Sequence, residues 1–223
     1  RGIGRAIAHI YAAEGARVAI CGRNREDLLA VADEIKSLGA ECLAVKIDLC
    51  DHEAAIKLVD TVHRTYGRID VLVNNHSALG PRETIMEYPA DEWDEVIRTN
   101  LTSTYWVTKE ALGKMVPQNS GSIVMVSSAA GRHGRAKWGA YAVSKAGLEG
   151  LTQVLADELK AYKIRVNSVN PGPTRTDMRK AAYPAEDPKT LPAPADITNV
   201  FVYLASDASA GINGELFEAL DWM

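Results

Sequence analysis

Short apolar segments alternate with amphipathic segments of helical length along the whole chain of 223 residues. The predicted strands are 17–22, 41–48, 69–75, 121–128, 164–172 and 214–220, and the predicted helices are 2–14, 25–38, 52–66, about 91–116, 140–159 and 194–206. Strands that alternate with helices of a dozen residues form right-handed βαβ units. The sequence therefore predicts an α/β protein in one domain over 1–223, with a doubly wound parallel sheet and helices on both faces.

Charge and cysteine content exclude several classes of protein. The 25 Lys and Arg against 29 Asp and Glu give a formal net charge of −4, which disfavours binding to nucleic acid because phosphate backbones require clustered cations. No apolar run approaches the ~20 residues that cross a bilayer. Three cysteines, Cys21, Cys42 and Cys50, are too few for a disulfide framework and suit a reducing compartment. We expect a cytoplasmic protein that binds neither nucleic acid nor membrane.

Glycines and arginines lie where a doubly wound sheet binds a dinucleotide. Gly2-Ile3-Gly4 begins the first helix, where free N–H groups attract a phosphate. The residue after the next strand meets the adenosine ribose, and an acid there binds the 2′-hydroxyl whereas an arginine binds a 2′-phosphate. Here Arg23 and Asn24 follow that strand, and Arg1 precedes the glycines. These positions favour NADP(H) over NAD(H); two ordinary surface arginines are the alternative.

Polar residues also end the next two predicted strands. Asp48 ends one of them, and Asn74 and Asn75 end the other. A short polar side chain there can bind the adenine amino group or can tie strand ends together as a turn residue. Both interpretations stay open for Asn74.

Ser128, Tyr141 and Lys145 form the strongest constellation. Tyr141 and Lys145 are four residues apart and share one face of the predicted helix, and Ser128 ends the preceding strand. A phenol titrates near ~10 in water, and a cation one turn away lowers that pKa. The tyrosine then becomes a usable general acid or base, and the serine hydroxyl can hold a substrate oxygen beside it.

Taken together, these residues resemble the short-chain dehydrogenase/reductase family, whose fold is Rossmann-like. The matching segments follow one another along nearly the whole chain: RGIGRAIA, IDLC, IDVLVNN, RTNLTS, VSSAAG, YAVSK, VNPGPTRTDM and LASDASAGINGE. Each motif alone is weak, and their order and separation make the resemblance specific.

The resemblance implies a role for each matching residue. Tyr141 is the expected proton donor or acceptor, Lys145 binds the nicotinamide ribose and lowers the Tyr141 pKa, Ser128 orients the carbonyl or alcohol, and Asn100 holds a water in a proton relay. The expected cofactor contacts, besides Tyr141 and Lys145, are Arg1, Gly2, Ile3, Gly4, Arg23, Asn24, Asp48, Leu49, Asn75, Pro171, Gly172, Thr174 and Thr176. No metal site is expected.

Two features depart from the family pattern. His76-Ser77 stands where the family usually has Ala-Gly, either as a tolerated variant or as side chains that reach the cofactor or substrate. The first strand and the Thr-Gly that opens the glycine-rich loop have no counterpart before Arg1. We therefore expect a fragment in which the strands at 17–22 and 69–75 flank a gap; direct closure of these two strands is the alternative.

The resemblance implies an NADP(H)-dependent oxidoreductase that acts on a small carbonyl compound or secondary alcohol. It is similar to the 3-oxoacyl-(acyl-carrier-protein) reductases, although the basic residues that dock the carrier fall at Asn119 and Tyr162. The alternatives are an NAD-dependent alcohol dehydrogenase and a non-catalytic dinucleotide-sensing regulator. The expected pocket walls are Trp138, Met178, Tyr183 and Pro184.

The resemblance also implies a homodimer or homotetramer built on the helices at 91–116 and 140–159. The apolar residues expected at that interface are Leu101, Tyr105, Val107, Leu148, Leu151 and Leu155.

Overall fold

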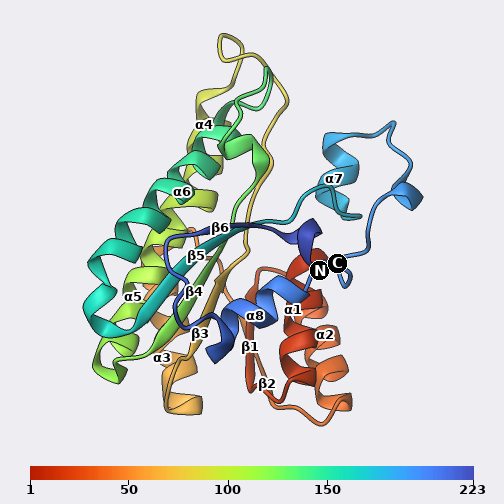
Figure 1. Cartoon of the computed structure of the whole chain (residues 1–223). Helices are drawn as coiled ribbons and strands as arrows, with labels where there is room; N and C mark the ends of the chain where they lie inside the picture. The colour runs from red at the N-terminus through yellow and green to blue at the C-terminus, as the bar shows by residue number, and fades with distance from the viewer.

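The computed structural model describes residues 1–223 and places helices on both faces of parallel β-structure (Figure 1). The strands are β1 (Val18–Gly22), β2 (Cys42–Lys46), β3 (Val71–Asn74), β4 (Gly121–Val126), β5 (Ile164–Asn170) and β6 (Leu216–Glu218). The helices are α1 (Gly2–Ala13), α2 (Arg25–Ser37), α3 (His52–Tyr66), α4 (Ala90–Ile97), α5 (Ser103–Gln118), α6 (Gly139–Glu158), α7 (Asp177–Ala182) and α8 (Asn199–Ala205). Five 3₁₀ turns lie at 129–131, 160–162, 188–190, 207–209 and 219–222.

Local sequence signals begin and end these helices. The Asn24 side chain accepts the Asp27 N–H at the start of α2, and the Asp51 side chain accepts the Glu53 N–H at the start of α3. Gly67, at φ +80°, ends α3 in the left-handed conformation that favours glycine. None of the helices is both long enough and apolar enough to span a bilayer.

Two helical layers enclose the strands. Helices α3, α5 and α6 cover one face, where Val107, Met115 and Leu155 pack on β4 and β5 in the largest core cluster. Helices α1 and α8 cover the other face, and Phe201 lies in the core cluster there. Every strand pair is parallel, so the carboxyl ends of β3, β4 and β5 meet at one edge, where the ligand site of such a sheet lies.

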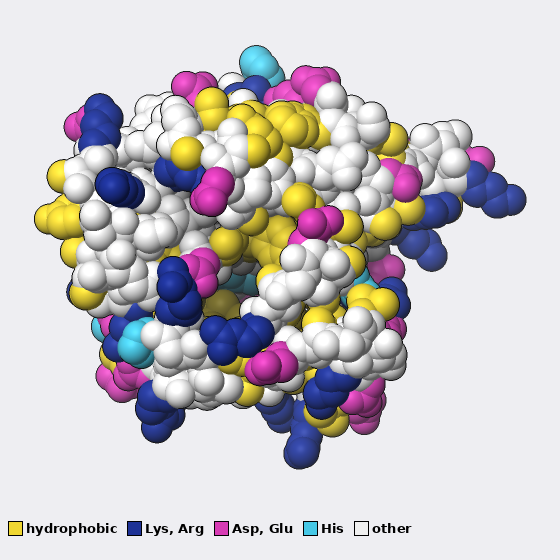
Figure 2. Space-filling model, turned by 60° about the horizontal axis from the view of Figure 1, so that its bottom comes forward, with side chains coloured by type: hydrophobic (Ala, Val, Ile, Leu, Met, Phe, Trp, Pro, Cys, Tyr) yellow, Lys and Arg dark blue, Asp and Glu magenta, His cyan; other side chains and the backbone are white.

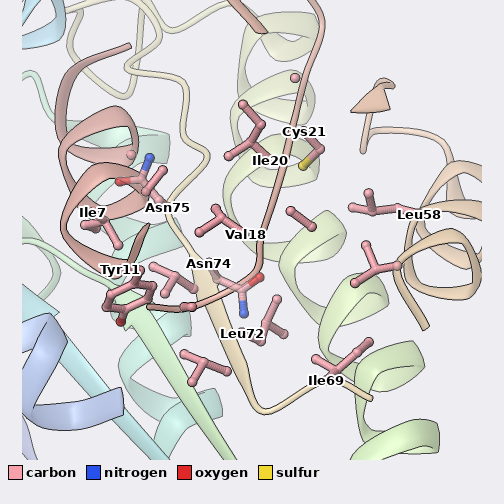
Figure 3. Close-up of a pocket in the computed structure, with 18 of the residues that line it drawn as sticks. Ile7, Tyr11, Val18, Ile20, Cys21, Leu58, Ile69, Leu72, Asn74 and Asn75 are labelled. Atoms are coloured by element: carbon pink, nitrogen blue, oxygen red, sulfur yellow. The ribbon is translucent and has the colours of Figure 1, made fainter. Parts of the chain in front are cut away.

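The strands form two separate sheets. One has the order β1-β2 and the other β3-β4-β5-β6. A cavity of about 1200 Å³ lies between β1 and β3 and is lined mainly by hydrophobic side chains; a hollow lined by such side chains opens in Figure 2. Figure 3 shows the residues around the cavity, including Val18 and Ile20 of β1, Leu72 and Asn74 of β3, and Ile7 and Tyr11 of α1. The structure has the expected gap, and the two strands do not close on one another.

Several predicted boundaries are wrong. The helix predicted at 91–116 is α4 and α5 joined by a π-helical turn at Arg98–Thr102. The helix predicted at 194–206 begins only at Asn199, because the preceding side chains bond to the nearby backbone and form turns instead. Helix α7 was not predicted. Strand β1 ends at Gly22 as expected, and the other five strands end one or two residues earlier than expected.

Three of the six residues expected at a subunit interface belong to the core instead. Val107, Leu148 and Leu155 are buried, because the inner faces of α5 and α6 pack on the sheet. The exposed large hydrophobic residues on these two helices are Tyr105, Val143 and Val154.

The gap predicts that an added strand stabilises the protein. Five or six apolar residues followed by Thr-Gly, placed before Arg1, would pair with the free edges of β1 and β3. Each new hydrogen bond contributes about 1 kcal/mol, and 1 kcal/mol is worth about 2–4 °C at this size. We expect the melting temperature to rise by roughly 10 °C or more. A Gly-Ser extension of equal length is the control, and equal melting temperatures for the two extensions would contradict the prediction.

Candidate active site

The first turns of α6 and the carboxyl end of β4 bring Tyr141, Lys145 and Ser128 together. Lys145 Nζ donates to the Val126 carbonyl at 2.8 Å and lies 5.7 Å from the centre of the Tyr141 ring. Ser128 follows β4, and its Oγ accepts the Ala130 N–H at 3.2 Å, which caps the turn at 129–131. That turn packs tightly on α6, since a Cβ added at Gly131 would lie 2.7 Å from the Lys145 backbone. The structure therefore assembles the predicted constellation.

Burial controls the acidity of Tyr141. The side chain lies almost entirely out of water, and this desolvation raises the pKa of the phenol, while a hydrogen bond with the Ser128 hydroxyl opposes the rise. The pKa of Tyr141 is therefore raised in this structure, and the expected lowering by Lys145 is not found. The Lys145 ammonium points at the Val126 carbonyl rather than at the phenol oxygen.

Lys145 is a buried cation with a carboxylate nearby. Its side chain is 2% exposed, and burial lowers its pKa to about 8, while Glu149 acts in the opposite direction. Glu149 lies one turn further along α6, where its Oε2 accepts from Ser168 Oγ at 2.7 Å. Its Oε1 is buried without a hydrogen-bond partner. The sequence prediction missed Glu149, although its i,i+4 spacing from Lys145 could have revealed it.

Asn100 sits in the π-helical turn and is fully buried. Its Oδ1 accepts the Ala78 N–H at 2.7 Å, and its Nδ2 donates to the Ala78 carbonyl and to Ser144 Oγ, both at 2.9 Å. π-Helical turns occur frequently at functional sites. In this structure the Asn100 side chain ties the loop after β3 to α6, and its part in a proton relay stays a prediction.

The start of α1 forms a cradle for a phosphate group. Gly2 has φ +54°, and a Cβ added there would lie 3.5 Å from the Thr176 methyl group. A Cβ added at Gly4 would lie 2.6 Å from Asn75 Nδ2, so a larger residue would displace the Asn75 side chain. No side chain caps α1, and no acid lies in its first turn. Its free N–H groups therefore suit a pyrophosphate. Ile3, between the glycines, packs against the core on the α8 side.

The predicted ribose-side residues meet at the ends of β1 and β2. Arg1, Arg23 and Asn24 line the cavity that lies between β1 and β3. Arg1 pairs with Asp27 at 3.2 Å, whereas Arg23 forms no ion pair. Asp48 lies two residues beyond β2, where its Oδ1 accepts the Cys50 N–H. Leu49 also lines the cavity and packs against the core. Asn74 is structural, because its buried Nδ2 donates to Thr108 Oγ1 at 3.0 Å.

The loop from Pro171 to Thr176 is held by its own hydrogen bonds. Thr174 Oγ1 contacts the Pro171 and Gly172 carbonyls, and Thr176 Oγ1 caps α7 by accepting the Arg179 N–H. Gly172, at φ +69°, has no room for a Cβ beside Leu220. The loop brings Thr176 next to Gly2 at the cradle, and its contacts with a cofactor stay a prediction.

His76 docks against α5. Its Nε2 lies 2.6 Å from Ser103 Oγ and 3.4 Å from Thr104 Oγ1. Both hydroxyls already donate to carbonyls of the preceding turn, so they accept here, and Nε2 carries the proton. Burial, together with the Lys145 charge, lowers the His76 pKa to about 4. The ring is therefore neutral near pH 7. Ser77 Oγ is buried without a partner.

Aromatic residues pack beside Tyr141, among them residues predicted as pocket walls. The Trp138 ring lies 5.5 Å from the Tyr141 ring and 6.0 Å from the Tyr183 ring. Met178 of α7 packs in the same cluster as Tyr141. Arg82, which sequence analysis did not single out, stacks on Trp138 at 4.1 Å. No group of His, Cys, Asp and Glu side chains has the arrangement of a metal site.

A sequence model of the short chain dehydrogenases matches residues 1–187. The chain belongs to the short-chain dehydrogenase family. It is 40% identical to the uncharacterized oxidoreductase YciK of Escherichia coli K12 over 98% of this chain and 87% of the relative. It is 36% identical to the 3-oxoacyl-(acyl-carrier-protein) reductase FabG of Aquifex aeolicus over 97% of this chain and 90% of the relative.

A crystal structure of a short-chain dehydrogenase from Shigella flexneri 2a, complexed with NADP, superimposes with a TM-score of 0.94. It is 40% identical and covers 98% of this chain and 92% of its own. The family and the doubly wound α/β fold are therefore as predicted, and this short-chain dehydrogenase is an oxidoreductase.

We predict that Lys145 of this short-chain dehydrogenase titrates near pH 8. Below that pH the ammonium is charged. Between about 8 and the model-peptide pKa of about 10.4 the unfolded chain binds more protons, so this group makes stability rise with pH. Glu149→Gln keeps the Ser168 bond but removes a negative charge, so the midpoint should fall. NMR of ¹³C-labelled lysine measures the titration midpoint of Lys145 in the wild type and in the variant. Glu158→Gln, at the exposed end of α6, should leave the midpoint unchanged, and an equal midpoint for Glu149→Gln would contradict the prediction.

Proposed function

We propose that this short-chain dehydrogenase is an NADP(H)-dependent enzyme that interconverts a carbonyl group and a secondary alcohol in a small molecule. The observation that carries the proposal is the placement of Tyr141, Lys145 and Ser128 at the carboxyl end of β4. A phosphate cradle at the start of α1 lies at the same edge of the structure. We propose that residues 1–223 act as one NAD(P)-binding unit.

The residues present fit a dinucleotide. The α1 cradle offers uncapped N–H groups, and Asn75 and Thr176 close around the two glycines. Arg23 is the free cation for a 2′-phosphate, while Arg1 is shared with Asp27. The relative from S. flexneri was crystallised with NADP, which supports NADP(H) here. When bound, the nicotinamide supplies or accepts the hydride.

The chain itself supplies orientation and a proton. The Tyr141 hydroxyl donates the proton to the carbonyl oxygen during reduction, and Ser128 Oγ holds that oxygen beside it. The raised pKa keeps Tyr141 protonated, which suits the donor role. Lys145, anchored on the Val126 carbonyl, supplies the positive charge that stabilises the phenolate left after transfer.

Replacing Tyr141 tests the proton donor. Tyr141→Phe removes only the hydroxyl, so folding and NADPH binding should persist while kcat falls by about 10²–10⁴, the usual value of positioned acid catalysis. NADPH oxidation with a panel of aldehydes and ketones measures the change. Tyr162→Phe, on the surface, is the matched control. Near-normal turnover by Tyr141→Phe would sink the assignment.

Replacing Arg23 tests the cofactor and separates this proposal from an NAD-dependent alcohol dehydrogenase. Arg23→Asp places a carboxylate where the 2′-phosphate is expected. The ratio of kcat/KM for NADPH over NADH should fall tenfold or more, since a charged hydrogen bond is worth about 1.5–3 kcal/mol. Arg64→Asp, on the exposed face of α3, controls for net charge. An unchanged ratio in Arg23→Asp would place Arg23 outside the cofactor site.

We further propose a cytoplasmic homodimer or homotetramer. The three cysteines are unpaired, which suits a reducing compartment. Tyr105 on α5 and Val143 and Val154 on α6 are 47–54% exposed, and two-fold packing of these helices would cover them. Light scattering at micromolar concentration measures the mass, and a monomer would contradict the assembly.

A further inference from the structure

Arg82 lies where three segments meet beside Tyr141. Its Nε donates to the Lys137 carbonyl at 2.9 Å, in the loop before α6, and its Nη1 donates to the Ala182 carbonyl at 3.2 Å, at the end of α7. The guanidinium stacks on the Trp138 ring, which in turn lies 5.5 Å from the Tyr141 ring. A single aromatic ring therefore separates this cation from the proposed proton donor.

The Arg82 charge has no counter-ion in the chain. Two arginines stack on Tyr183, Arg179 at 3.9 Å and Arg82 at 5.7 Å. Arg179 holds both carboxylate oxygens of Glu186 at 2.6 Å. Arg82 is only partly exposed and bonds to carbonyl oxygens alone. Two of its five N–H groups are used, so three are left for a ligand.

The neighbouring loop adds to the positive field. Residues 132–137, RHGRAK, directly precede Trp138, and all six are exposed. Arg132 pairs with Glu218, whereas Arg135 and Lys137 form no ion pair. The chain as a whole carries a net charge of −4, so the positive charge of this loop is opposite in sign to the net charge of the protein. Clefts lined by one sign of charge concentrate ligands of the opposite sign.

We propose that Arg82 is the anion-binding residue of the substrate pocket, and that the substrate is a carbonyl compound carrying a carboxylate or phosphate group. This inference rests on the proposed function and names its substrate class. Arginine suits either group, because its planar fork binds two oxygens at once. Trp138 fixes the orientation of that fork and separates it from the reacting carbonyl.

Matched substrate pairs test the proposal. The assays use the 223-residue chain, or the chain with the added N-terminal strand if only that form reduces carbonyl compounds. 4-Oxopentanoate with 2-pentanone tests the carboxylate, and dihydroxyacetone phosphate with dihydroxyacetone tests the phosphate. We expect the anionic member of at least one pair to have the higher kcat/KM, and that pair identifies the group. Arg82→Met should lower kcat/KM for that anionic member about 10- to 100-fold and change the neutral member by less than about threefold. Arg82→Lys should retain part of the preference.

Arg179→Met is the matched control. Arg179 stacks on the same tyrosine but already holds Glu186, so its loss should affect both members of a pair alike. Competitive inhibition of the wild type by succinate or inorganic phosphate, weakened in Arg82→Lys, gives a readout that does not need Arg82→Met to fold. Equal losses for anionic and neutral substrates in Arg82→Met, or no anion preference in the wild type, would overturn the inference. Absence of turnover with every carbonyl would overturn the proposed function itself.

Discussion

The Lys145 ammonium is buried at the carboxyl end of β4, and the arrangement of the rest of the site depends on this burial. Burying an ammonium costs free energy unless it is hydrogen-bonded and near opposite charge. Here the Val126 carbonyl accepts from Lys145, and Glu149 lies one turn beyond it. These contacts fix the rotation of α6 on the sheet. The same rotation directs Tyr141 toward the site and Leu148 toward the core.

The expected elements were largely predictable, because parallel strands buried on both faces read as short apolar runs and their helices as amphipathic ones. The errors lie where side chains bond to the backbone or where the chain must leave the sheet. The π-helical turn at 98–102 contains no Gly or Pro, so the sequence around it carries no signal of a helix end. Helix α7 has only six residues and buries none of them completely.

The proposed catalytic pair was predictable from spacing, because Tyr141 and Lys145 are neighbours within one helix. The surroundings were not, because they depend on contacts between segments far apart in the sequence. Arg82 reaches Ala182 across 100 positions. The Arg1 pair with Asp27 and the contact of Gly2 with Thr176 are of the same kind. The sign of the Tyr141 pKa shift also needed the structure, since burial outweighs every other influence on that phenol.

The π-helical turn has a consequence for how this chain can change length. A π turn holds one more residue than an α turn, so it offsets the two flanking helices by about 100°. Helix α4 then presents Val96 to Tyr141, while α5 presents Val107 and Met115 to a different core cluster. If one residue were deleted from 98–102, the segment could form ordinary α-helical hydrogen bonds. The deletion would nevertheless rotate α4 relative to α5, so that one of the two apolar faces would no longer point at its core cluster. The packing of α4 and α5 therefore constrains the number of residues in this segment, whichever residues occupy it.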